Sequence, residues 1–319
     1  MKLLITGGYG FIGSNFINLV SKMGHKILNI DNVTYAANRS NINMAPNIKN
    51  VEIDIVEYNL LEKTILDFQP DAVIHFAAES HVDNSIENPY VFLNTNIFGT
   101  YNLLQACSKL TNDFHYIHIS TDEVFGELDK EGFFTEKTSY DPKSPYSASK
   151  ASSDHLVRAW VNTYDFPATI VNCCNNYGPN QHKEKLIPKI ITHCLVGDDI
   201  PIYGTGENIR DWIFVEDFCQ AILLIINHKS VTLNNSFCIG ANEELTNIEI
   251  TKKICSTINE NFNLKHNCLD LIKYVDDRPG HDFRYAIDAS KIRRDLSWKP
   301  DHTFEEGIEK TINYYKDSL

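Results

Sequence analysis

Two adjacent carboxylates follow an apolar run in the segment HISTDEVFG, residues 118–126. Thr121, Asp122 and Glu123 place one hydroxyl and then two acids at the end of a predicted strand. Neighbouring like charges repel, so an enclosed pair tends to keep a proton on one member. Such a pair can supply both a proton donor and a proton acceptor to one reaction. The residues alone also allow a solvated acidic turn that does no chemistry.

A glycine-rich loop, TGGYGFIGS (6–14), comes directly after the first predicted strand. Gly7, Gly10 and Gly13 permit a tight turn, close approach of a pyrophosphate and close helix packing. Asp31 ends the second predicted strand, 24 residues after Gly7. A carboxylate at that point binds both ribose hydroxyls and repels a 2′-phosphate. The loop therefore predicts a dinucleotide cofactor, and Asp31 favours NAD over NADP.

A third candidate group is Tyr146 and Lys150, which stand four residues apart in SPYSASKAS (144–152) and so share one helix face. A free tyrosine has a pKa near 10. A lysine ammonium and an oxidised nicotinamide nearby would lower the pKa of Tyr146. The phenolate could then remove a proton from an alcohol while the cofactor takes the hydride. Two surface residues on a helix are the alternative reading.

The scaffold that would position these groups is a doubly wound α/β fold. Short apolar runs alternate with longer amphipathic stretches, which is typical of a parallel sheet flanked by helices. Helices are expected over 94–110 and 147–164. The predicted strands cover residues 2–6, 26–30, 50–54, 72–76, 115–120 and 168–172.

The alternation of strands and helices changes after the turn-rich NYGPNQ segment. Residues 1–178 are therefore predicted to form an NAD-binding Rossmann domain, and residues 179–319 a smaller mixed α/β lobe that mainly binds substrate. Two short strands, near 211–215 and 235–240, are expected to return to the first sheet. The segment of about 211–241 would then belong to the first domain.

Composition excludes several other classes of protein. The 319 residues carry 29 basic and 42 acidic side chains, a net charge of −13, so binding to nucleic acid is opposed. No apolar run reaches the roughly 18 residues that span a bilayer. The eight cysteines form no C-x-x-C pair and are interpreted as reduced thiols of a cytoplasmic protein. His75, Glu79 and His81 lack a supporting cluster, so no metal site is predicted.

The motifs together resemble the extended short-chain dehydrogenase/reductase superfamily, and within it the nucleotide-sugar 4,6-dehydratases. The resemblance runs almost from end to end. The segments that carry it are TGGYGFIGSN, DNVTYAAN, HFAAESHVDNSI, STDEVFGE, YSASKAS, NNYGPNQ, EKLIP, RDWIFVEDF and DRPGHDFRYAID.

The resemblance implies a role for each member of the candidate groups. Asp122 would donate a proton to the departing C6 hydroxyl, and Glu123 would accept the C5 proton. Tyr146 would be the base for the C4 hydroxyl, Thr121 would hydrogen-bond the C4 oxygen, and Lys150 would hold the ribose and tune Tyr146. The product would be a 4-keto-6-deoxy sugar nucleotide.

The resemblance also implies contacts with cofactor and substrate. Asn32 departs from the lysine common in the family, and QHKEK departs from the usual aromatic-proline before EKLIP. The implied cofactor contacts are Gly7, Gly10, Phe11, Ile12, Gly13, Asp31, Asn32, Val33, Thr34, Asp54, Ile55, Phe76, Ala77, Ala78, Glu79, Ser80, Thr95, Tyr146, Lys150 and Asn176. The implied substrate contacts are Ser80, Thr121, Asn175, Lys185, Leu186, Pro201, Ile202, Tyr203, Arg210, Asn247, Asp277, Arg278, Pro279, Gly280 and His281.

Several alternatives remain open at this point. DRPGHD is similar to the bacterial dTDP-glucose enzymes, whereas HVDNS and YGPNQ resemble UDP-glucose dehydratases, so the two bases stand near even. A nucleotide-sugar 4-epimerase is the first rival, although the related epimerases lack the Asp-Glu pair. A non-catalytic NAD-binding regulator is the second. By analogy, the helices at 94–110 and 147–164 predict a homodimer through a four-helix bundle.

Overall fold

The computed structural model describes residues 1–277 and 280–318. Two predicted substrate contacts, Arg278 and Pro279, lie outside the described residues. The strands are β1 (Lys2–Thr6), β2 (Lys26–Asp31), β3 (Ile48–Glu52), β4 (Ala72–His75), β5 (His115–Thr121), β6 (Ala168–Cys173), β7 (Asn175–Tyr177), β8 (Ile200–Tyr203), β9 (Ile209–Phe214), β10 (Ser236–Ile239), β11 (Glu244–Thr246) and β12 (Ile272–Val275).

The helices alternate with these strands through the first half of the chain. They are α1 (Phe11–Ser21), α2 (Tyr58–Phe68), α3 (Val82–Glu87), α4 (Pro89–Phe92), α5 (Thr100–Cys107), α6 (Pro145–Tyr164), α7 (Leu186–Val196), α8 (Val215–Asn227), α9 (Lys229–Thr232), α10 (Asn247–Asn261), α11 (Ser290–Leu296) and α12 (Phe304–Asp317). Shorter turns are η1 (Arg39–Asn41), η2 (Leu93–Gly99), η3 (Asp122–Phe125) and η4 (Cys268–Leu271).

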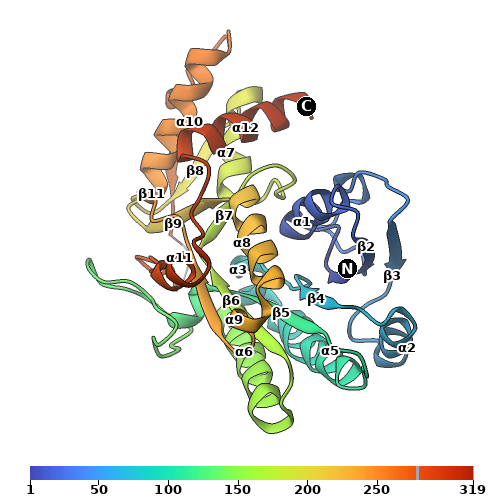
Figure 1. The fold of residues 1–319 in the computed structure, drawn as a ribbon. Coiled ribbons are helices and arrows are strands. Elements are labelled where there is room, and N and C mark those ends of the chain that lie inside the picture. Colours follow the sequence, from blue (N-terminus) through green and yellow to red (C-terminus); the bar gives the residue numbers. More distant parts are fainter. Residues whose placement is uncertain (278–279, 319) are drawn as a thin grey trace.

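A parallel sheet with strand order β10-β6-β5-β4-β1-β2-β3 forms the centre of the described chain (Figure 1). The predicted doubly wound Rossmann class is confirmed. Helices cover both faces of such a sheet, so its strands are buried. β5 is buried along its whole length. The six predicted strands of the first half all occur, displaced by at most two residues.

Two hydrophobic clusters cover the faces of this sheet, and alternate residues of β1 point to opposite sides. Leu3 packs into the same cluster as Phe16 of α1 and Phe218 of α8. Leu4 packs with Leu104 of α5 and Val157 of α6 on the other face. The sheet is therefore held between two helical layers, and the carboxyl ends of its strands stay available for a site.

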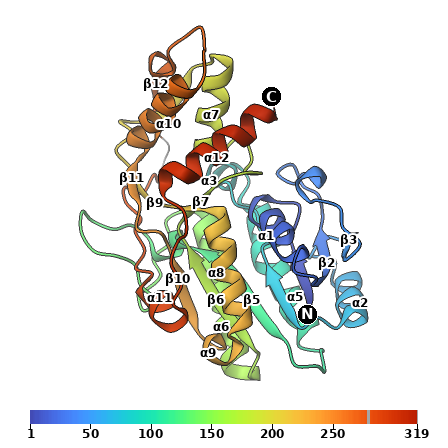
Figure 2. The ribbon, with the colours of Figure 1, turned by 45° about the horizontal axis from the view of Figure 1, so that its top comes forward.

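The C-terminal lobe stands apart from the main sheet, where α7, α10 and α12 gather at the top of the molecule (Figure 2). Its own core joins Ile190, Ile254 and Ile308 from these three helices. In the described chain it contains the sheets β11-β9-β7 and β12-β8. These small mixed sheets agree with the predicted second lobe.

The chain returns to the first sheet after β9. The predicted strand near 235–240 is β10, which pairs with β6 at the edge of the main sheet. The predicted strand near 211–215 is β9, and here the prediction of its sheet is wrong. β9 pairs with β7 and β11 instead, because the sequence of a short strand does not specify its partner strand.

The predicted helix over 94–110 is also divided. The segment begins as the π-helical turn η2 and continues as α5, which ends at Cys107. Asn96 in this turn accepts from Glu79 N at 2.9 Å and donates to Glu79 O at 3.0 Å, so the wider turn anchors the loop after β4. No helix in the described ranges is long and apolar enough to cross a membrane.

Candidate active site

A cavity of about 310 Å³ lies at the carboxyl ends of the strands, around β1 and β4. This is where the strand order reverses direction, the usual binding position in open α/β sheets. The cavity brings together all three candidate groups. The predicted cofactor residues that line it are Gly7, Gly10, Phe11, Ile12, Gly13, Asp31, Asn32, Thr34, Asp54, Ile55, Phe76, Ala77, Ala78, Glu79, Ser80, Thr95, Tyr146, Lys150 and Asn176.

The glycine loop is built for close contacts that side chains would prevent. Gly7 has a φ of 72°, and a Cβ there would lie 2.6 Å from Ala77 N. A Cβ on Gly13 would lie 2.3 Å from Gly7 O. Gly10 is the N-cap of α1 and provides no side-chain cap, so the first-turn amides of the helix are left for an anion.

Asp31 is held in place by backbone donors at the end of β2. Tyr9 N donates to Asp31 Oδ2 at 2.9 Å, and Val33 N donates to Oδ1 at 2.8 Å. Val33 itself does not line the cavity, and its φ of 54° is unusual for a β-branched residue. Asn32, in place of the family's lysine, donates to Asp54 Oδ2 at 2.9 Å.

The acid pair follows β5 in the short turn η3. Thr121 Oγ1 accepts from Glu123 N at 3.2 Å and donates to Asp122 Oδ1, also at 3.2 Å. Asp122 is 1% exposed, and its Oδ2 is buried without a hydrogen-bond partner in the described chain. This geometry excludes a solvated turn for Asp122.

The surroundings of Asp122 favour its protonated form. Burial, and then the neighbouring Glu123 carboxylate, raise the pKa of Asp122 well above its ordinary value. The charge of Arg210 acts in the opposite direction, and Asp211 adds to the increase. Asp122 is therefore biased toward its protonated form beside a second acid that lines the same cavity.

Tyr146 and Lys150 both lie in the cavity wall near the start of α6. Lys150 Nζ donates to Ile119 O at 2.8 Å, and burial lowers the pKa of Lys150. Burial, and then Glu123, raise the pKa of Tyr146 well above 10, while a hydrogen bond with Thr121 opposes this. Lys150 does not by itself produce the lowered pKa expected from the sequence. The positive charge of a bound nicotinamide is the other part of that prediction.

Three features of the cavity fit a dinucleotide. The amides at the start of α1 suit a pyrophosphate, and Asp31 suits a ribose. Asn176 Nδ2 donates to Cys174 O at 3.0 Å, whereas its Oδ1 is buried with no hydrogen-bond partner in the described chain. An orphaned buried oxygen in a cavity wall is a natural contact for a ligand donor.

Four predicted substrate residues also line this cavity, namely Ser80, Thr121, Asn175 and Lys185. Lys185 Nζ donates to Ser80 O at 2.8 Å and so joins the two lobes. The remaining described ones do not line it: Leu186, Pro201, Ile202, Tyr203, Arg210, Asn247, Asp277, Gly280 and His281.

Part of this second set forms its own cluster in the C-terminal lobe. His281 Nδ1 lies 2.7 Å from Asp277 Oδ1, and its ring meets that of Tyr203 edge-on at 6.4 Å. Arg210 is 5% exposed and donates to the carbonyl of Asp282 at 2.9 Å. Ile202 is buried in the lobe core, so only its backbone is left for a substrate. The roles of these residues stay predictions.

Some residues of the site carry no sequence signal. Asn29 Oδ1 accepts from Gly8 N at 3.0 Å and supports the glycine loop from below. The signal that could have indicated this role is a polar asparagine inside the mainly apolar strand β2. Other cavity-lining residues outside the predictions are Ile30, Ala36, Ala37, Ile53, Ile119, Ser120, Cys173, Cys174, Gln181, His182 and Glu184.

The histidines considered for metal binding have other contacts. His75 Nδ1 lies 2.7 Å from Thr6 Oγ1, and its Nε2 lies 3.0 Å from Thr100 Oγ1. Among residues 1–277 and 280–318, no group of three or more His, Cys, Asp or Glu side chains could hold a metal ion.

Asp211 gives a prediction about stability and pH. It is fully buried on β9, Oδ1 accepts from Glu243 N at 2.8 Å, and burial raises its pKa from 3.8 to about 6. The folded state binds the proton more tightly, so stability is lost as pH rises from about 4 through 6. Two pKa units correspond to up to about 3 kcal/mol. We expect Asp211→Asn to remove this loss, measured as urea unfolding of both proteins at pH 4.5 and 7.5. An equal pH dependence in the two proteins would contradict it.

Comparison with known proteins places this site in context. The family described as GDP-mannose 4,6-dehydratase matches residues 4–311. A dTDP-glucose 4,6-dehydratase of Escherichia coli is 46% identical over 340 aligned residues, which cover 99% of this chain and 93% of that protein. The relative from Haemophilus influenzae with the same name is also 46% identical, over 99% of this chain and 98% of its own length.

Solved structures with the same fold as this chain include enzymes of different activity. The crystal structure of DesIV, a dTDP-glucose 4,6-dehydratase from Streptomyces venezuelae with NAD and TYD bound, superposes with a TM-score of 0.92. Its identity is 39%, over 99% of this chain and 97% of that one. A UDP-glucose 4-epimerase from Thermotoga maritima has a TM-score of 0.91 over the full length of both chains, but an identity of only 27%. With the acid pair in its cavity, the chain belongs to the nucleotide-sugar 4,6-dehydratase family of the extended short-chain dehydrogenases/reductases.

Proposed function

We propose that this chain is an NAD-dependent dTDP-glucose 4,6-dehydratase, which converts dTDP-glucose into dTDP-4-keto-6-deoxyglucose and water. The observation that carries the proposal is the pairing of buried Asp122 with Glu123 in the wall that also holds Tyr146. A 4-epimerase needs only oxidation and reduction at C4, so it has no use for a second acid and base.

The choice of dTDP over UDP rests on the relatives. The bases differ by one methyl group, and the sequence motifs alone leave them near even. The compared curated relatives at 46% identity are named dTDP-glucose 4,6-dehydratases, and so is the solved DesIV. A methyl group in a fitted pocket is worth roughly 10- to 200-fold in specificity, so we expect a clear preference rather than exclusivity.

The first half of the reaction depends on Tyr146 and Thr121. NAD, when bound, takes up a hydride from C4 of the glucose and returns it at C6. We assign to Tyr146 the removal of the C4 hydroxyl proton, with Thr121 Oγ1 orienting the C4 oxygen. Lys150, buried below Tyr146 on the same helix, would supply positive charge to the phenolate and a donor to the ribose.

The second half depends on the acid pair. A ketone at C4 acidifies the C5 proton, which Glu123 would remove as the C6 hydroxyl leaves. Asp122 would give its proton to that hydroxyl, so water departs and the C5–C6 double bond forms. C5 would then take back a proton as the hydride arrives at C6. The raised pKa of Asp122 suits this donor role.

We further propose a division of labour between the lobes. Residues 1–178, with the returning segment of α8 and β10, would bind NAD, and the other residues of 179–319 would mainly bind the nucleotide sugar. Arg210 and the group of Tyr203, Asp277 and His281 would contact the nucleotide end of the substrate. Arg210 also acts on the charge of Asp122, which links this cluster to the acid pair.

Side-by-side kinetics test the proposed function. The enzyme would be assayed with dTDP-glucose and UDP-glucose for the alkali-induced absorbance of the 4-keto product and for galactose formation. We expect 4-keto product from both, with a kcat/KM about tenfold or more higher for dTDP-glucose. Formation of the galactose-containing sugar nucleotide without 4-keto product would support the epimerase instead. No turnover of either would support the non-catalytic regulator.

We propose that the enzyme is a homodimer that acts in the cytoplasm. All eight cysteines are free and buried, a state that a reducing compartment preserves. Large apolar side chains on α4, η2 and α5 are exposed next to α6, among them Tyr90 (70%) and Phe98 (59%). Such a patch fits a four-helix bundle between two copies of the chain.

The dimer proposal gives a direct test. Phe98→Glu should place a charge in the apolar patch and convert the protein to monomers, as measured by sedimentation velocity. Met44→Glu is the matched control. Met44 is 86% exposed and lies in the loop after η1, outside α4, η2 and α5. A monomeric wild-type protein, or an unchanged dimer with Phe98→Glu, would contradict the proposed interface.

A further inference from the structure

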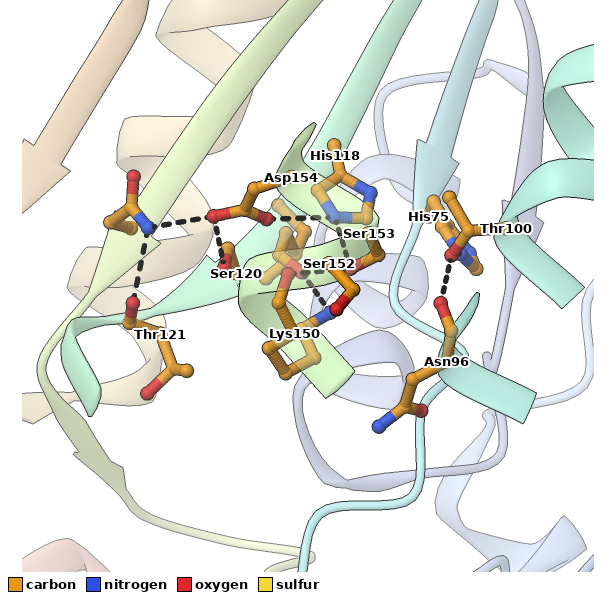
Figure 3. Close-up of polar contacts among 12 residues, drawn as sticks. His75, Asn96, Thr100, His118, Ser120, Thr121, Lys150, Ser152, Ser153 and Asp154 are labelled. Carbon is orange, nitrogen blue, oxygen red and sulfur yellow. Dashed lines mark hydrogen bonds and ion pairs between the residues drawn. The ribbon is translucent and has the colours of Figure 1, made fainter. Parts of the chain in front are cut away.

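A buried carboxylate lies behind the active site, on the same helix as Tyr146 and Lys150. Asp154 follows Lys150 by one helical turn on α6, so the two side chains share a face. Asp154 is 0% exposed and Lys150 is 4% exposed. Burying a carboxylate without partners is costly, so the contacts of Asp154 indicate why it is there (Figure 3).

One oxygen of Asp154 gathers donors from three other segments. Asp154 Oδ2 accepts from Ser120 Oγ on β5 at 2.8 Å and from Tyr140 OH at 2.8 Å. Asn172 Nδ2 on β6 lies 3.3 Å from the same oxygen and also donates to Thr121 O at 3.1 Å. As Figure 3 shows, the carboxylate thus joins α6 to the carboxyl ends of β5 and β6, directly beside Thr121.

The second oxygen faces a neutral histidine. Asp154 Oδ1 lies 3.1 Å from His118 Nε2, which is also 3.2 Å from Ser153 Oγ. Burial, and then the charge of Lys150, lower the pKa of His118, so the imidazole is uncharged near neutral pH. Burial alone would raise the pKa of Asp154, but His118, Lys150 and Tyr140 together bring it below its ordinary value.

The titratable groups that act on Lys150 come from four elements. They are Asp154 on α6 itself, His75 on β4, His118 on β5 and Cys173 on β6. Burial lowers the pKa of both histidines and raises that of the Cys173 thiol to about 12, so all three are neutral. Among these described neighbours, Asp154 is the group that remains ionised near neutral pH.

We propose that Asp154 is a positioning residue of this active site. Its carboxylate holds the ends of β5 and β6 together beside Thr121 and supplies the counter-charge for the buried ammonium of Lys150. The proposal rests on the function proposed above in assigning Lys150 to catalysis, but the charge pairing itself does not depend on any substrate.

A double-mutant cycle on stability tests the charge pairing. Lys150→Met removes the buried ammonium whose charge acts on the Asp154 carboxylate, so the thermal midpoint should fall. Adding Asp154→Asn removes the charge, and its amide oxygen can still accept from Ser120. We expect the double variant to unfold at least about 3 °C above Lys150→Met alone. Lys150→Met with Tyr140→Phe is the control, because it removes a hydrogen bond to the same oxygen and keeps the charge.

The pH profile of turnover tests the positioning role. Asp154 raises the pKa of Lys150, so Asp154→Asn should lower it and shift the alkaline limb of C4 oxidation, followed as reduced nicotinamide in a single turnover of dTDP-glucose, to lower pH. We expect kcat to fall about tenfold or more while KM changes less than about threefold. Tyr140→Phe should leave the limb where it is, because the charge is retained.

The two experiments test separate parts of the proposal, so one can fail while the other still gives a result. If Asp154→Asn alone does not fold, its combination with Lys150→Met still carries the stability test. Additive losses in the cycle would overturn the counter-charge. An alkaline limb that does not move in an active, folded Asp154→Asn protein would overturn the positioning role. Absence of turnover in the wild-type enzyme would count against the proposed function and leave the cycle as a separate result.

Discussion

Replacing Tyr146 with phenylalanine should abolish sugar oxidation while leaving the protein folded. The substitution removes one buried hydroxyl and keeps the ring, which meets Phe92 edge-on at 6.3 Å. Without the phenol there is no group to take the C4 hydroxyl proton as hydride leaves. We expect kcat to fall roughly 10²- to 10⁴-fold, with no absorbance of reduced nicotinamide in a single-turnover mixture of enzyme, NAD and dTDP-glucose.

The control for this variant is its stability and its affinity for NAD. Both should stay near the wild-type values, because the helix N-terminus is capped independently by Ser144, whose side chain accepts from Ser147 N at 3.1 Å. Turnover within a few-fold of the wild-type rate would remove Tyr146 from the mechanism.

The acid pair should fail at a later step than Tyr146, and its two members should fail differently. Glu123→Gln removes the base, so the sugar is oxidised at C4 but C5 no longer exchanges with deuterium from the solvent. Asp122→Asn keeps that base and removes the proton donor, so C5 exchange continues while water is not lost. In each case we expect kcat for the 4-keto-6-deoxy product to fall roughly 10²- to 10⁴-fold, measured with mass spectrometry of the sugar.

The pH dependence adds a second measurement to the acid pair. Asp122 works in its protonated form, so the rate of water loss should fall as pH rises through its elevated pKa. The residual activity of Asp122→Asn should lack that limb. If both variants lose C4 oxidation together with C5 exchange, the two acids act as one structural unit, and the separate roles are wrong.

The sequence predicts the main sheet and the glycine loop well, for local physical reasons. Strands that are covered by helices on both faces are rich in apolar residues, and the runs in β1 and β4 stand out in the sequence for that reason. Gly7 and Gly13 lie where any Cβ would meet backbone atoms. Only glycine fits these two positions, so the residue type alone indicates the tight loop. The acid pair stands out for the same reason, because two adjacent carboxylates at a buried strand end demand an explanation.

The contacts that cross long stretches of sequence could not be predicted. The pairing of β9 with β7 depends on geometry built by the intervening α7 and β8. The short sequence of β9 does not indicate this pairing. The π-helical turn at Asn96 looks like ordinary helix in the sequence. Asp154 follows SKAS on a helix, where a single aspartate normally faces solvent, yet its partners Ser120, Tyr140 and Asn172 surround it.

The edge position of β10 has a consequence for synthesis of the protein. β10 covers the open side of β6, and it is made only when about three quarters of the 319 residues have been translated. Until then a nascent chain on the ribosome leaves the backbone edge of β6 unpaired. We therefore expect the nucleotide-binding half to complete its sheet only late in synthesis, with the edge of β6 open to aggregation before that point.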